Sequence, residues 1–386
     1  MSTLPATAEV VIVGGGVMGV STAYHLAAKG CPDVVLLERE PFFGTQATGK
    51  CAGGIRYQFA TEINIRLSLH SLPMLERFEE EMGQPIDLRF CGYLFLLTRE
   101  EDVAQFRRNV ALQHRMGVMT EWLEADEVRR RLPMMRLDDL LAATFHAKDG
   151  LADPNGVVQG YVTQARRLGA KLFTDVTVTD IRVEGGRVRG VVTDRGEIAT
   201  PNVVNAAGPW AKVVGAMAGV EVPVEPVRRQ IVVTTPLPEI PPDFPFVIDF
   251  AQALYFHREG EGLLTGMSNP NEPPGFDQSV DEAWELVHLE AAMKRLPLLE
   301  KAGILSHWAG LYEVSPDAHP ILGRVPEVEG FYCINGFSGH GFMHGPIAGL
   351  LLAEEILDGA AHTVDITPLR IDRFRRGEKI VEYNVV

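Results

Sequence analysis

The feature that most constrains this chain is a glycine-rich turn close to its start. An apolar strand pattern over residues 10–13 is followed by Gly14, Gly16 and Gly19 and by a helical pattern that ends near Lys29. In this spacing the first glycine allows a sharp turn and the second lets the backbone approach a pyrophosphate. The third lets the helix pack against the strand. The stretch therefore predicts a dinucleotide-binding strand–helix–strand unit.

An acidic residue, Glu38, stands at the end of the second predicted strand. It lies 19 residues after Gly19, where an acid accepts a hydrogen bond from the ribose 2′-OH of a dinucleotide. The start of the helix, at Val17 and Met18, offers unpaired N–H groups to the phosphates. An acid at this position favours FAD or NAD over NADP, and the stretch alone does not choose between FAD and NAD.

Composition and charge exclude several classes of function. The chain has 386 residues, of which 46% are hydrophobic, so it can form two domains or one domain with a large insertion. Its formal net charge of −15 disfavours nucleic acid and anionic lipid as partners. The four cysteines are scattered without a CxxC pair, which predicts neither a zinc site nor a disulfide framework. We therefore expect no bound metal.

The N-terminal residues and the hydropathy pattern lead to an expected location. No basic region precedes an apolar stretch at the N-terminus, and no apolar run reaches membrane-spanning length. We therefore expect a cytoplasmic protein without a membrane span.

Strand and helix patterns alternate along the chain, with antiparallel hairpins inserted between them. Helices are predicted over residues 63–82, over residues 346–357, and after an N-terminal cap at Asp153. Hairpin turns are predicted at 184–187 and 194–197. The predicted fold class is α/β with an α+β second domain, in which a discontinuous Rossmann-like nucleotide-binding domain accompanies a mixed-sheet substrate domain.

The predicted nucleotide-binding domain is discontinuous in sequence. It is expected to comprise residues 1–80, 150–220 and 310–386, since strand–turn–helix patterns of the nucleotide-binding kind recur in these ranges. Residues 81–149 and 221–309 form the expected substrate domain.

Three further stretches combine small residues with turns. The stretch 44–54 contains four glycines, and such a stretch lets the backbone lie against a flat ligand, although a flexible surface loop would have a similar composition. A β-branched strand runs into small residues at 203–210, and a strand leads into a glycine turn and a helix at 331–342.

Together these motifs resemble the FAD-dependent amino-acid and amine oxidoreductases of the D-amino-acid oxidase family. The branch they resemble most contains the sarcosine oxidases, the β subunits of their multimeric relatives and the β subunits of L-proline dehydrogenases. The resemblance covers nearly the whole chain and rests on the glycine turn with Glu38, and on residues 48–56, 204–210, 312–317 and 336–342. It implies FAD rather than NAD, and hence a Rossmann-like FAD-binding domain.

The resemblance also implies which residues hold FAD. The glycine turn would hold the pyrophosphate, Glu38 the adenosine ribose and the backbone of Val176 the adenine. Residues 48–54 would run beside the isoalloxazine ring, and residues 339–343 would close over its other side. Cys51 could instead be a buried thiol, and Trp210 a packing residue. The cofactor-binding positions are Gly14, Gly16, Val17, Met18, Gly19, Glu38, Arg39, Thr48, Gly49, Lys50, Cys51, Gly53, Gly54, Val176, Ala207, Gly208, Trp210, Gly310, Gly339, His340, Gly341, Phe342 and Met343.

Four residues are candidates for contact with the substrate or for catalysis. Arg56 matches the arginine that pairs with the substrate carboxylate in the family, and a guanidinium suits this role because it is planar and bidentate. Tyr255 resembles a tyrosine that lines the substrate pocket. His340 is either a hydrogen-bond donor near the flavin or a loop histidine bonded to backbone. Met343 stands where related oxidases carry a lysine that helps hold the carboxylate.

The chain departs from the monomeric sarcosine oxidases at three positions. Gly310 stands where those enzymes carry the cysteine that bonds the flavin covalently, so we expect non-covalent FAD. Leu264 stands about where a lysine associated with oxygen reactivity lies over the flavin, and Met343 replaces the second lysine. These losses weaken the expectation of a fast reaction with O2. Lys50 is an alternative cation near the ring.

The resemblance implies a redox enzyme acting on a small secondary amino acid. The first expectation is oxidation of sarcosine (N-methylglycine) to glycine and formaldehyde, with H2O2 formed when O2 is the acceptor. The alternatives are an L-proline or related amino-acid dehydrogenase using another electron acceptor, and a flavin-binding subunit or assembly protein. The expected partners are the small substrate and O2 or another acceptor, while a homo-oligomer or a partner subunit stays open.

Overall fold

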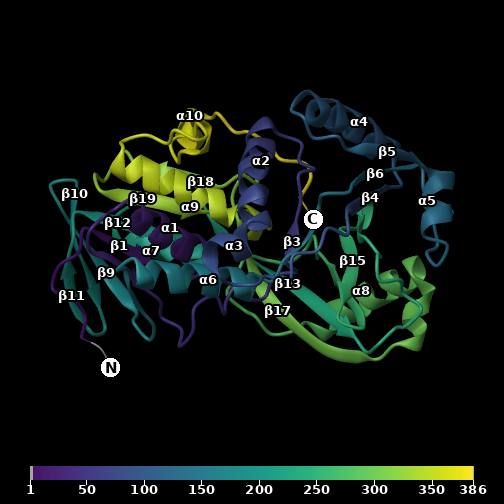
Figure 1. Cartoon of the computed structure of the whole chain (residues 1–386), viewed down its shortest axis with the longest axis horizontal. Coiled ribbons are helices and arrows are strands. Elements are labelled where there is room, and N and C mark those ends of the chain that lie inside the picture. Colours follow the sequence, from purple (N-terminus) through teal and green to yellow (C-terminus); the bar gives the residue numbers. More distant parts are fainter. Residues whose placement is uncertain (1–2, 386) are drawn as a thin grey trace.

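The computed structural model describes residues 3–385 and shows two lobes side by side (Figure 1). One lobe is built on a six-stranded sheet and the other on an eight-stranded sheet. A three-stranded sheet belongs to the first lobe, and β3 (Gly54–Ile55) pairs with β7 (Gly150–Leu151). The mixed α/β architecture confirms the predicted fold class.

The six-stranded sheet has the order β18-β19-β12-β1-β2-β8. All its neighbouring strands are parallel except β18, which runs antiparallel to β19. Strands β1 and β2 are buried at every position, which explains why they appear in the sequence as unbroken apolar runs. The strands are β1 (Val10–Val13), β2 (Val34–Leu37), β8 (Lys171–Phe173), β12 (Asn202–Asn205), β18 (Ile321–Arg324) and β19 (Phe331–Asn335).

The predicted hairpins form a separate three-stranded antiparallel sheet. Its strands are β9 (Val178–Glu184), β10 (Arg187–Thr193) and β11 (Gly196–Ala199), and β10 lies in the middle. Both predicted hairpin turns are confirmed, since β9 pairs with β10 and β10 with β11.

The eight-stranded sheet has the order β17-β13-β16-β15-β14-β4-β6-β5. It is a mixed sheet because β4 and β14 run parallel while the other neighbours are antiparallel. The strands are β4 (Tyr93–Leu97), β5 (Glu121–Glu124), β6 (Ala142–His146), β13 (Glu225–Thr234), β14 (Phe246–Asp249), β15 (Leu254–Glu259), β16 (Gly262–Met267) and β17 (Ile304–Val314).

The helices cover both sheets. The predicted cap at Asp153 is confirmed, because its carboxylate accepts hydrogen bonds from the amides of Asn155 and Gly156 at 2.9 Å each. Among residues 3–385 no helix has the length and apolar character needed to cross a membrane. The α-helices are α1 (Val17–Ala28), α2 (Glu62–Glu76), α3 (Phe78–Met82), α4 (Glu100–Arg115), α5 (Ala125–Arg131), α6 (Pro154–Arg167), α7 (Ala211–Met217), α8 (Glu282–Arg295), α9 (Gly341–Leu357) and α10 (Arg373–Arg376).

Two predicted helix boundaries are wrong. The helix expected over 63–82 is divided at Arg77 into α2 and α3. The helix expected from Pro346 begins five residues earlier, at Gly341, so Pro346 lies inside α9. The proline lies against α1, where the Ser21 hydroxyl donates to its carbonyl oxygen at 3.3 Å. A proline inside a helix forfeits one backbone donor, so the pattern alone favoured a start at that residue.

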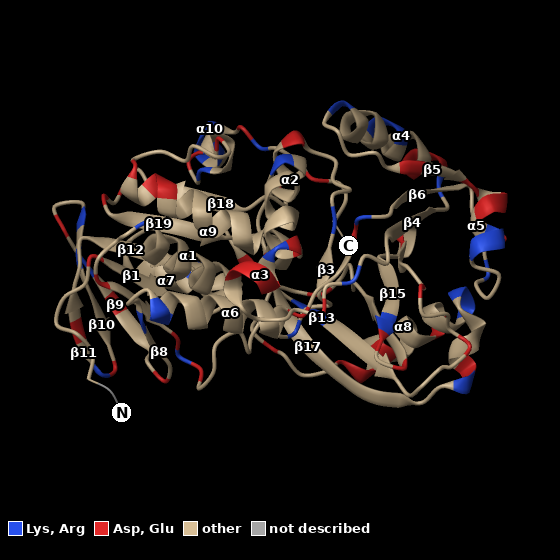
Figure 2. Ribbon diagram, viewed as in Figure 1, with Lys and Arg blue, Asp and Glu red and all other residues tan. Residues whose placement is uncertain are grey.

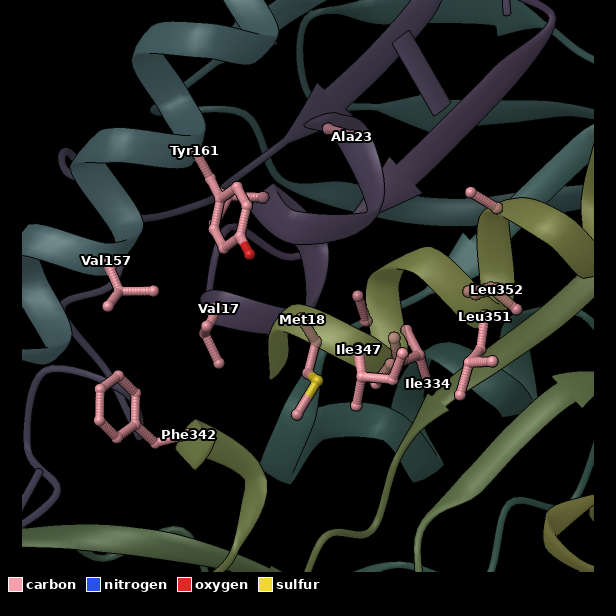
Figure 3. Close-up of a cluster of buried hydrophobic side chains, with 14 of the residues drawn as sticks. Val17, Met18, Ala23, Val157, Tyr161, Ile334, Phe342, Ile347, Leu351 and Leu352 are labelled. Carbon is pink, nitrogen blue, oxygen red and sulfur yellow. The ribbon is translucent and has the colours of Figure 1, made fainter. Parts of the chain in front are cut away.

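The core of the first lobe lies where α1, α6 and α9 pack together. Figure 3 shows side chains of these helices in one cluster, with Met18 of α1 beside Ile347 of α9. Tyr161 of α6 is fully buried in the same cluster. In Figure 2, Lys, Arg, Asp and Glu are interspersed on outer elements such as α5, whereas α1 carries none of them. Ten of the twelve residues of α1 are buried, so most of the helix surface is used for packing.

The strands of each sheet come from separate ranges of the sequence. The six-stranded sheet uses strands between residues 10 and 37, 171 and 205, and 321 and 335, and the eight-stranded sheet uses strands between 93 and 146 and between 225 and 314. On this basis we propose the discontinuous domain division expected from the sequence. Strand β17 of the eight-stranded sheet runs unbroken to Val314. We therefore propose that the last segment of the FAD-binding domain begins after Val314 rather than at residue 310.

Candidate active site

A cavity of about 400 Å³ lies where the two lobes meet. Its walls include the carboxyl ends of the parallel strands β1, β2 and β12, which is where open α/β sheets bind their ligands. The opposite walls come from β13, β14, β15 and β17 of the eight-stranded sheet. All the predicted site residues line this cavity except Gly19 and Gly49.

The glycine turn has the geometry that its spacing requires. Gly14 has a φ of +111°, and a Cβ at this position would lie 2.4 Å from the carbonyl oxygen of Ala206. A Cβ at Gly19 would lie 1.9 Å from the carbonyl oxygen of Gly14, so this glycine serves helix–strand packing rather than the cavity wall. These approaches leave no room for larger residues and bring the start of α1 to the cavity.

The amides around the start of α1 are only partly used within the protein. The Val17 amide donates to Thr48 Oγ1 at 3.1 Å. The N-cap residue, Gly16, has no side chain that could cap the other amides of the first turn. Met18, the next residue of the first turn, lines the cavity. The helix N-terminus therefore presents backbone donors and the positive end of its dipole to an anion such as a pyrophosphate.

Glu38 lies directly after β2 and beside this turn. Its carboxylate accepts hydrogen bonds from the amides of Gly15, at 2.6 Å, and Glu40, at 2.8 Å. Burial raises the pKa of Glu38, and these backbone bonds counteract part of that effect. Each oxygen retains a lone pair for a ribose hydroxyl. The Val176 amide donates to the Glu38 carbonyl oxygen at 3.0 Å, which holds Val176 in the same wall.

Arg39 and Trp210 form a contact at the same end of the cavity. The guanidinium carbon lies 3.7 Å from the centroid of the indole ring, and the ring system also stacks on Phe276 with 5.5 Å between centroids. Trp210 is thus both a packing residue and part of the wall. The planar stack makes a boundary suited to a flat aromatic group.

The loop 44–54 contacts β17 across the cavity. Lys50 Nζ donates to Gln278 Oε1 at 2.6 Å, and its backbone oxygen accepts from the Trp308 indole at 3.0 Å. A Cβ at Gly310 would lie 2.9 Å from the Cβ of Lys50, so the close packing of the loop favours glycine at this position. Burial raises the pKa of the Cys51 thiol to about 11, which keeps it protonated at neutral pH.

Arg56 is a buried cation in the cavity wall. It is 6% exposed, and its guanidinium donates to the backbone oxygens of Gln58 and Asn384. The Phe59 ring lies 4.0 Å from the guanidinium carbon. Among residues 3–385 no carboxylate forms an ion pair with Arg56, and burial lowers its pKa, an effect that the charge of Glu382 counteracts most. A guanidinium has five N–H donors, so Arg56 retains capacity for an anionic ligand.

His340 and Tyr255 present polar groups to the same cavity. His340 is 2% exposed, and neither ring nitrogen has a hydrogen-bond partner among the described residues. Burial lowers its pKa well below 6.5, with neighbouring His344 and Arg56 adding to the effect, so the imidazole is neutral. Among residues 3–385 the ring forms no hydrogen bond to backbone, so we favour a role as a hydrogen-bond donor near the flavin over that of a loop histidine. Burial likewise raises the pKa of Tyr255, so its hydroxyl stays protonated.

The remaining wall of the cavity near Arg56 is apolar and aromatic. Tyr93 and Phe246 stack with 4.1 Å between ring centroids, and Phe246 lies 5.7 Å from Tyr255. Met343 lines the cavity from α9, and its backbone oxygen accepts from the Ser71 hydroxyl at 2.7 Å. Leu264 is buried behind the wall and does not line the cavity.

The sequence analysis did not identify three residues of the cavity wall, two of them charged and one apolar. Arg229 lines the cavity 5.1 Å from the Tyr312 ring, and its buried Nε has no hydrogen-bond partner among residues 3–385. The alternation along β13 could have found it, because Arg229 shares a face with Ile231. Glu313 has a buried Oε2 without a hydrogen-bond partner in the described part of the chain. Val385 lines the cavity, and no local pattern predicts this.

The donors, acceptors and close glycine approaches fit one cofactor class. Backbone donors at α1 suit a pyrophosphate, Glu38 suits a ribose, and the unpaired Glu313 Oε2 suits a further hydroxyl. A Cβ at Gly54 would lie 1.7 Å from the Tyr93 hydroxyl oxygen, so the backbone and the aromatic wall meet closely there. This arrangement fits an extended dinucleotide with a flat ring at its far end.

Residues 9–355 match the sequence model of the DAO family, which is described as "FAD dependent oxidoreductase". The chain belongs to this family. Its cofactor is therefore FAD, and it is an oxidoreductase. The absence of a cysteine at Gly310 agrees with non-covalent binding.

Individual relatives share much of the sequence and the fold. Mitochondrial sarcosine dehydrogenase from Homo sapiens is 35% identical over 374 residues, which cover 92% of this chain and 40% of the relative. The chain thus spans less than half the length of that protein. Among solved structures, L-proline dehydrogenase from P. horikoshii superimposes with a TM-score of 0.90 and 34% identity, covering 98% of this chain and 100% of that chain. Glycine oxidase from Geobacillus kaustophilus gives a TM-score of 0.85 and 26% identity, covering 96% and 99%.

Proposed function

We propose that this FAD-dependent oxidoreductase oxidises a small secondary amino acid, with sarcosine as the first candidate. The observation that carries the proposal is Arg56, a buried cation without an ion-pair partner among residues 3–385, in an otherwise largely apolar part of the FAD cavity. A buried unpaired charge is costly, and an anionic ligand offsets that cost. The carboxylate of an amino acid supplies such an anion.

The same surroundings favour the reactive form of the amine. Oxidation of an amine to an imine requires the nitrogen to be neutral, and a cavity with apolar walls and the cations Arg56 and Arg229 disfavours an ammonium group. The neutral His340 can accept a hydrogen bond from the amine N–H or donate one to the carboxylate. The stacked Tyr93 and Phe246 rings would provide an apolar surface for a short N-alkyl group or a small ring.

When bound, FAD supplies the two-electron acceptor for this oxidation. The chain would hold it through the start of α1 at the pyrophosphate, through Glu38 at the adenosine ribose, and through Glu313 at a further hydroxyl. Sarcosine would lose a hydride and a proton to give an imine, and water would hydrolyse the imine to glycine and formaldehyde. If O2 takes the electrons, it is reduced to H2O2.

The second candidate is an L-proline dehydrogenase that passes its electrons to another acceptor. It is favoured by the similarity of both sequence and fold, over the full length, to the L-proline dehydrogenase from P. horikoshii. The absence of a lysine at Leu264 also supports an acceptor other than O2. A role only in assembly is disfavoured, because the cavity retains an anion-binding residue that such a role would not need. The cytoplasmic location and the oligomeric state remain predictions.

Anaerobic mixing of the purified flavoprotein with a panel of N-methyl and cyclic amino acids tests the proposal. Sarcosine or L-proline should bleach the visible absorbance of the flavin. Rapid recovery in air would identify an oxidase, and slow recovery would identify a dehydrogenase. Bleaching by none of the panel would contradict the proposed function and support a role in assembly.

A further inference from the structure

The segment Ile380–Val385, called here the 380–385 segment, lies between the two lobes (Figure 1). Its side chains alternate in burial along the backbone. Glu382 is 4% exposed and Asn384 is fully buried, whereas Val381 and Tyr383 are 47% and 58% exposed. An extended segment places successive side chains on opposite sides, so from Val381 to Asn384 one side of this segment faces the protein and the other faces water. Beyond them Val385 does not continue this alternation, because it is half-buried and lines the FAD cavity.

The first lobe holds the segment through Glu382. Its carboxylate accepts hydrogen bonds from the Ala60 amide and the Thr61 hydroxyl, each at 2.8 Å, and from Asn64 Nδ2 at 3.0 Å. The amide of Asn384 also donates to this carboxylate, at 3.0 Å. Four donors to one buried carboxylate fix the position of the segment against the start of α2.

Asn384 connects the segment with the second lobe and with the active site. Its side-chain oxygen accepts a hydrogen bond from Asn109 Nδ2 of α4 at 3.0 Å. Its backbone oxygen accepts a hydrogen bond from the Arg56 guanidinium. The next residue, Val385, lines the FAD cavity. The segment therefore brings a hydrogen-bond acceptor, the Asn384 backbone oxygen, to Arg56 and an apolar residue, Val385, to the wall of the same cavity.

The segment also supplies charge to this site. Burial disfavours the charged form of Arg56, and among the surrounding groups Glu382 opposes that effect most strongly. A carboxylate that does not touch the guanidinium lowers the cost of the buried cation and leaves its donors free. Glu382 thus stabilises Arg56 without occupying the place of an anionic ligand.

We propose that the 380–385 segment forms one wall of the substrate pocket, with Glu382 and Asn384 as positioning residues for Arg56 and Val385 as a residue that limits substrate size. This inference rests on the proposed function, because it takes the carboxylate site at Arg56 as the substrate site. It extends that function by assigning substrate selection to residues more than 300 positions away in the sequence from the glycine turn and Arg56.

Equilibrium titration with non-reactive carboxylates tests the role of Val385. Acetate, propionate and trimethylacetate differ in bulk but share the anion, and their binding is followed by difference absorbance of the bound flavin. Val385→Ala should improve the binding of trimethylacetate relative to acetate by about 10-fold, since one or two buried methyl groups in a pocket change discrimination by this order. Tyr383→Ala changes the outward side of the same segment and is the matched control.

Two outcomes would overturn the assignment of Val385. One is an acetate-to-trimethylacetate ratio that is the same in Val385→Ala, Tyr383→Ala and the wild type. The other is the absence of saturable binding of all three carboxylates to the wild-type flavoprotein. The titration requires no turnover, so it gives an answer even if no amino acid reduces the flavin and the proposed function fails.

Glu382→Gln tests the positioning role, because it removes the charge and keeps the shape. The acetate dissociation constant should rise about 10-fold while the FAD content is unchanged, because a neutral amide binds the four donors around it less strongly and holds Asn384 less firmly beside Arg56. If this variant does not fold, Asn109→Ala releases Asn384 from α4 and should weaken acetate binding in the same direction. An unchanged acetate affinity in whichever variant folds with FAD would overturn the positioning role.

Discussion

The guanidinium of Arg56 donates a hydrogen bond to the backbone oxygen of Asn384, 328 residues later in the chain. The bond joins the loop that follows the glycine-rich stretch to the 380–385 segment. It also fixes a cation at the boundary between the two lobes, within the FAD cavity. Most of the reactivity proposed for this protein depends on where this one side chain is held.

Replacement of Arg56 should weaken substrate binding and leave the cofactor in place. Arg56→Ala should raise KM for carboxylate substrates at least about 30-fold, since removal of one partner from a buried charge pair costs about 2 kcal/mol or more. Arg56→Lys keeps the charge and loses the bidentate geometry, so its KM should lie between that of the wild type and that of Arg56→Ala. Steady-state kinetics with parallel measurement of flavin content checks this. An unchanged KM in the alanine variant would remove Arg56 from the carboxylate site.

The close approach of Gly54 to Tyr93 predicts that a second substitution, at Tyr93, restores stability lost by a substitution at Gly54. A Cβ at Gly54 would lie 1.7 Å from the Tyr93 hydroxyl oxygen, so Gly54→Ala should lower the free energy of unfolding by about 1–3 kcal/mol and weaken FAD binding. Tyr93→Phe removes that oxygen and leaves the ring carbon Cζ at 3.1 Å, so the double variant should recover part of the loss. Chemical denaturation of the four proteins measures both effects. Equal losses with and without the Tyr93 hydroxyl would refute this explanation.

Glu313 predicts a pH dependence of stability in the FAD-free protein. Burial raises its pKa from 4.5 to about 7 in the folded state, so between these values the folded protein retains a proton that the unfolded chain has released. The contribution of Glu313 to stability therefore falls as the pH rises through this window, by at most about 1.4 kcal/mol per pH unit. Glu313→Gln lacks this titration.

Denaturation of both proteins from pH 5 to about pH 8 provides the measurement for Glu313. The unfolding free energy of the wild type minus that of the variant should decrease with rising pH and level off above about 7. A difference that does not vary with pH would show that the Glu313 carboxyl titrates normally.

The residue at position 310 predicts how the flavin is attached. Gly310 has no thiol, and a Cβ placed at this position would lie only 2.9 Å from Lys50 Cβ, so we expect the flavin to be held without a covalent bond. Acid precipitation should leave the yellow colour in the supernatant. Colour that stays with the precipitated protein would point to a covalent link through another residue.

The parts of the site that sequence predicts best are local. The spacing of Gly14 and Gly19 reports a steric requirement of one turn and one helix, so it could be recognised without knowing the fold. The Asp153 cap likewise depends on amides two and three residues away. The start of α9 at Gly341 is not predicted locally, because a proline usually marks the first turn of a helix, whereas Pro346 lies inside this helix and packs against α1.

The parts that sequence did not predict depend on tertiary contacts. Arg229 faces the cavity because the register of β13 places it on the side of Ile231, yet its neighbour Arg228 forms ion pairs with Glu272 and Asp277 on the outer side. The alternation with Ile231 puts Arg229 on one face of β13, but it does not say which face points inward unless the position of the strand in the sheet is known. The position of Val385 is still harder to predict from the sequence, because it depends on hydrogen bonds from several distant elements to Glu382 and Asn384.

Comparison of sarcosine with its carboxamide tests the central claim most directly. The two compounds carry the same secondary amine, and only sarcosine has the anion that Arg56 is proposed to bind. In anaerobic titrations, sarcosine should bleach the flavin at a concentration about 30-fold or more below that required for the amide, as expected for a charge-assisted contact of about 2 kcal/mol. Bleaching by both compounds at the same concentration would contradict the account, because the carboxylate would then have no part in recognition.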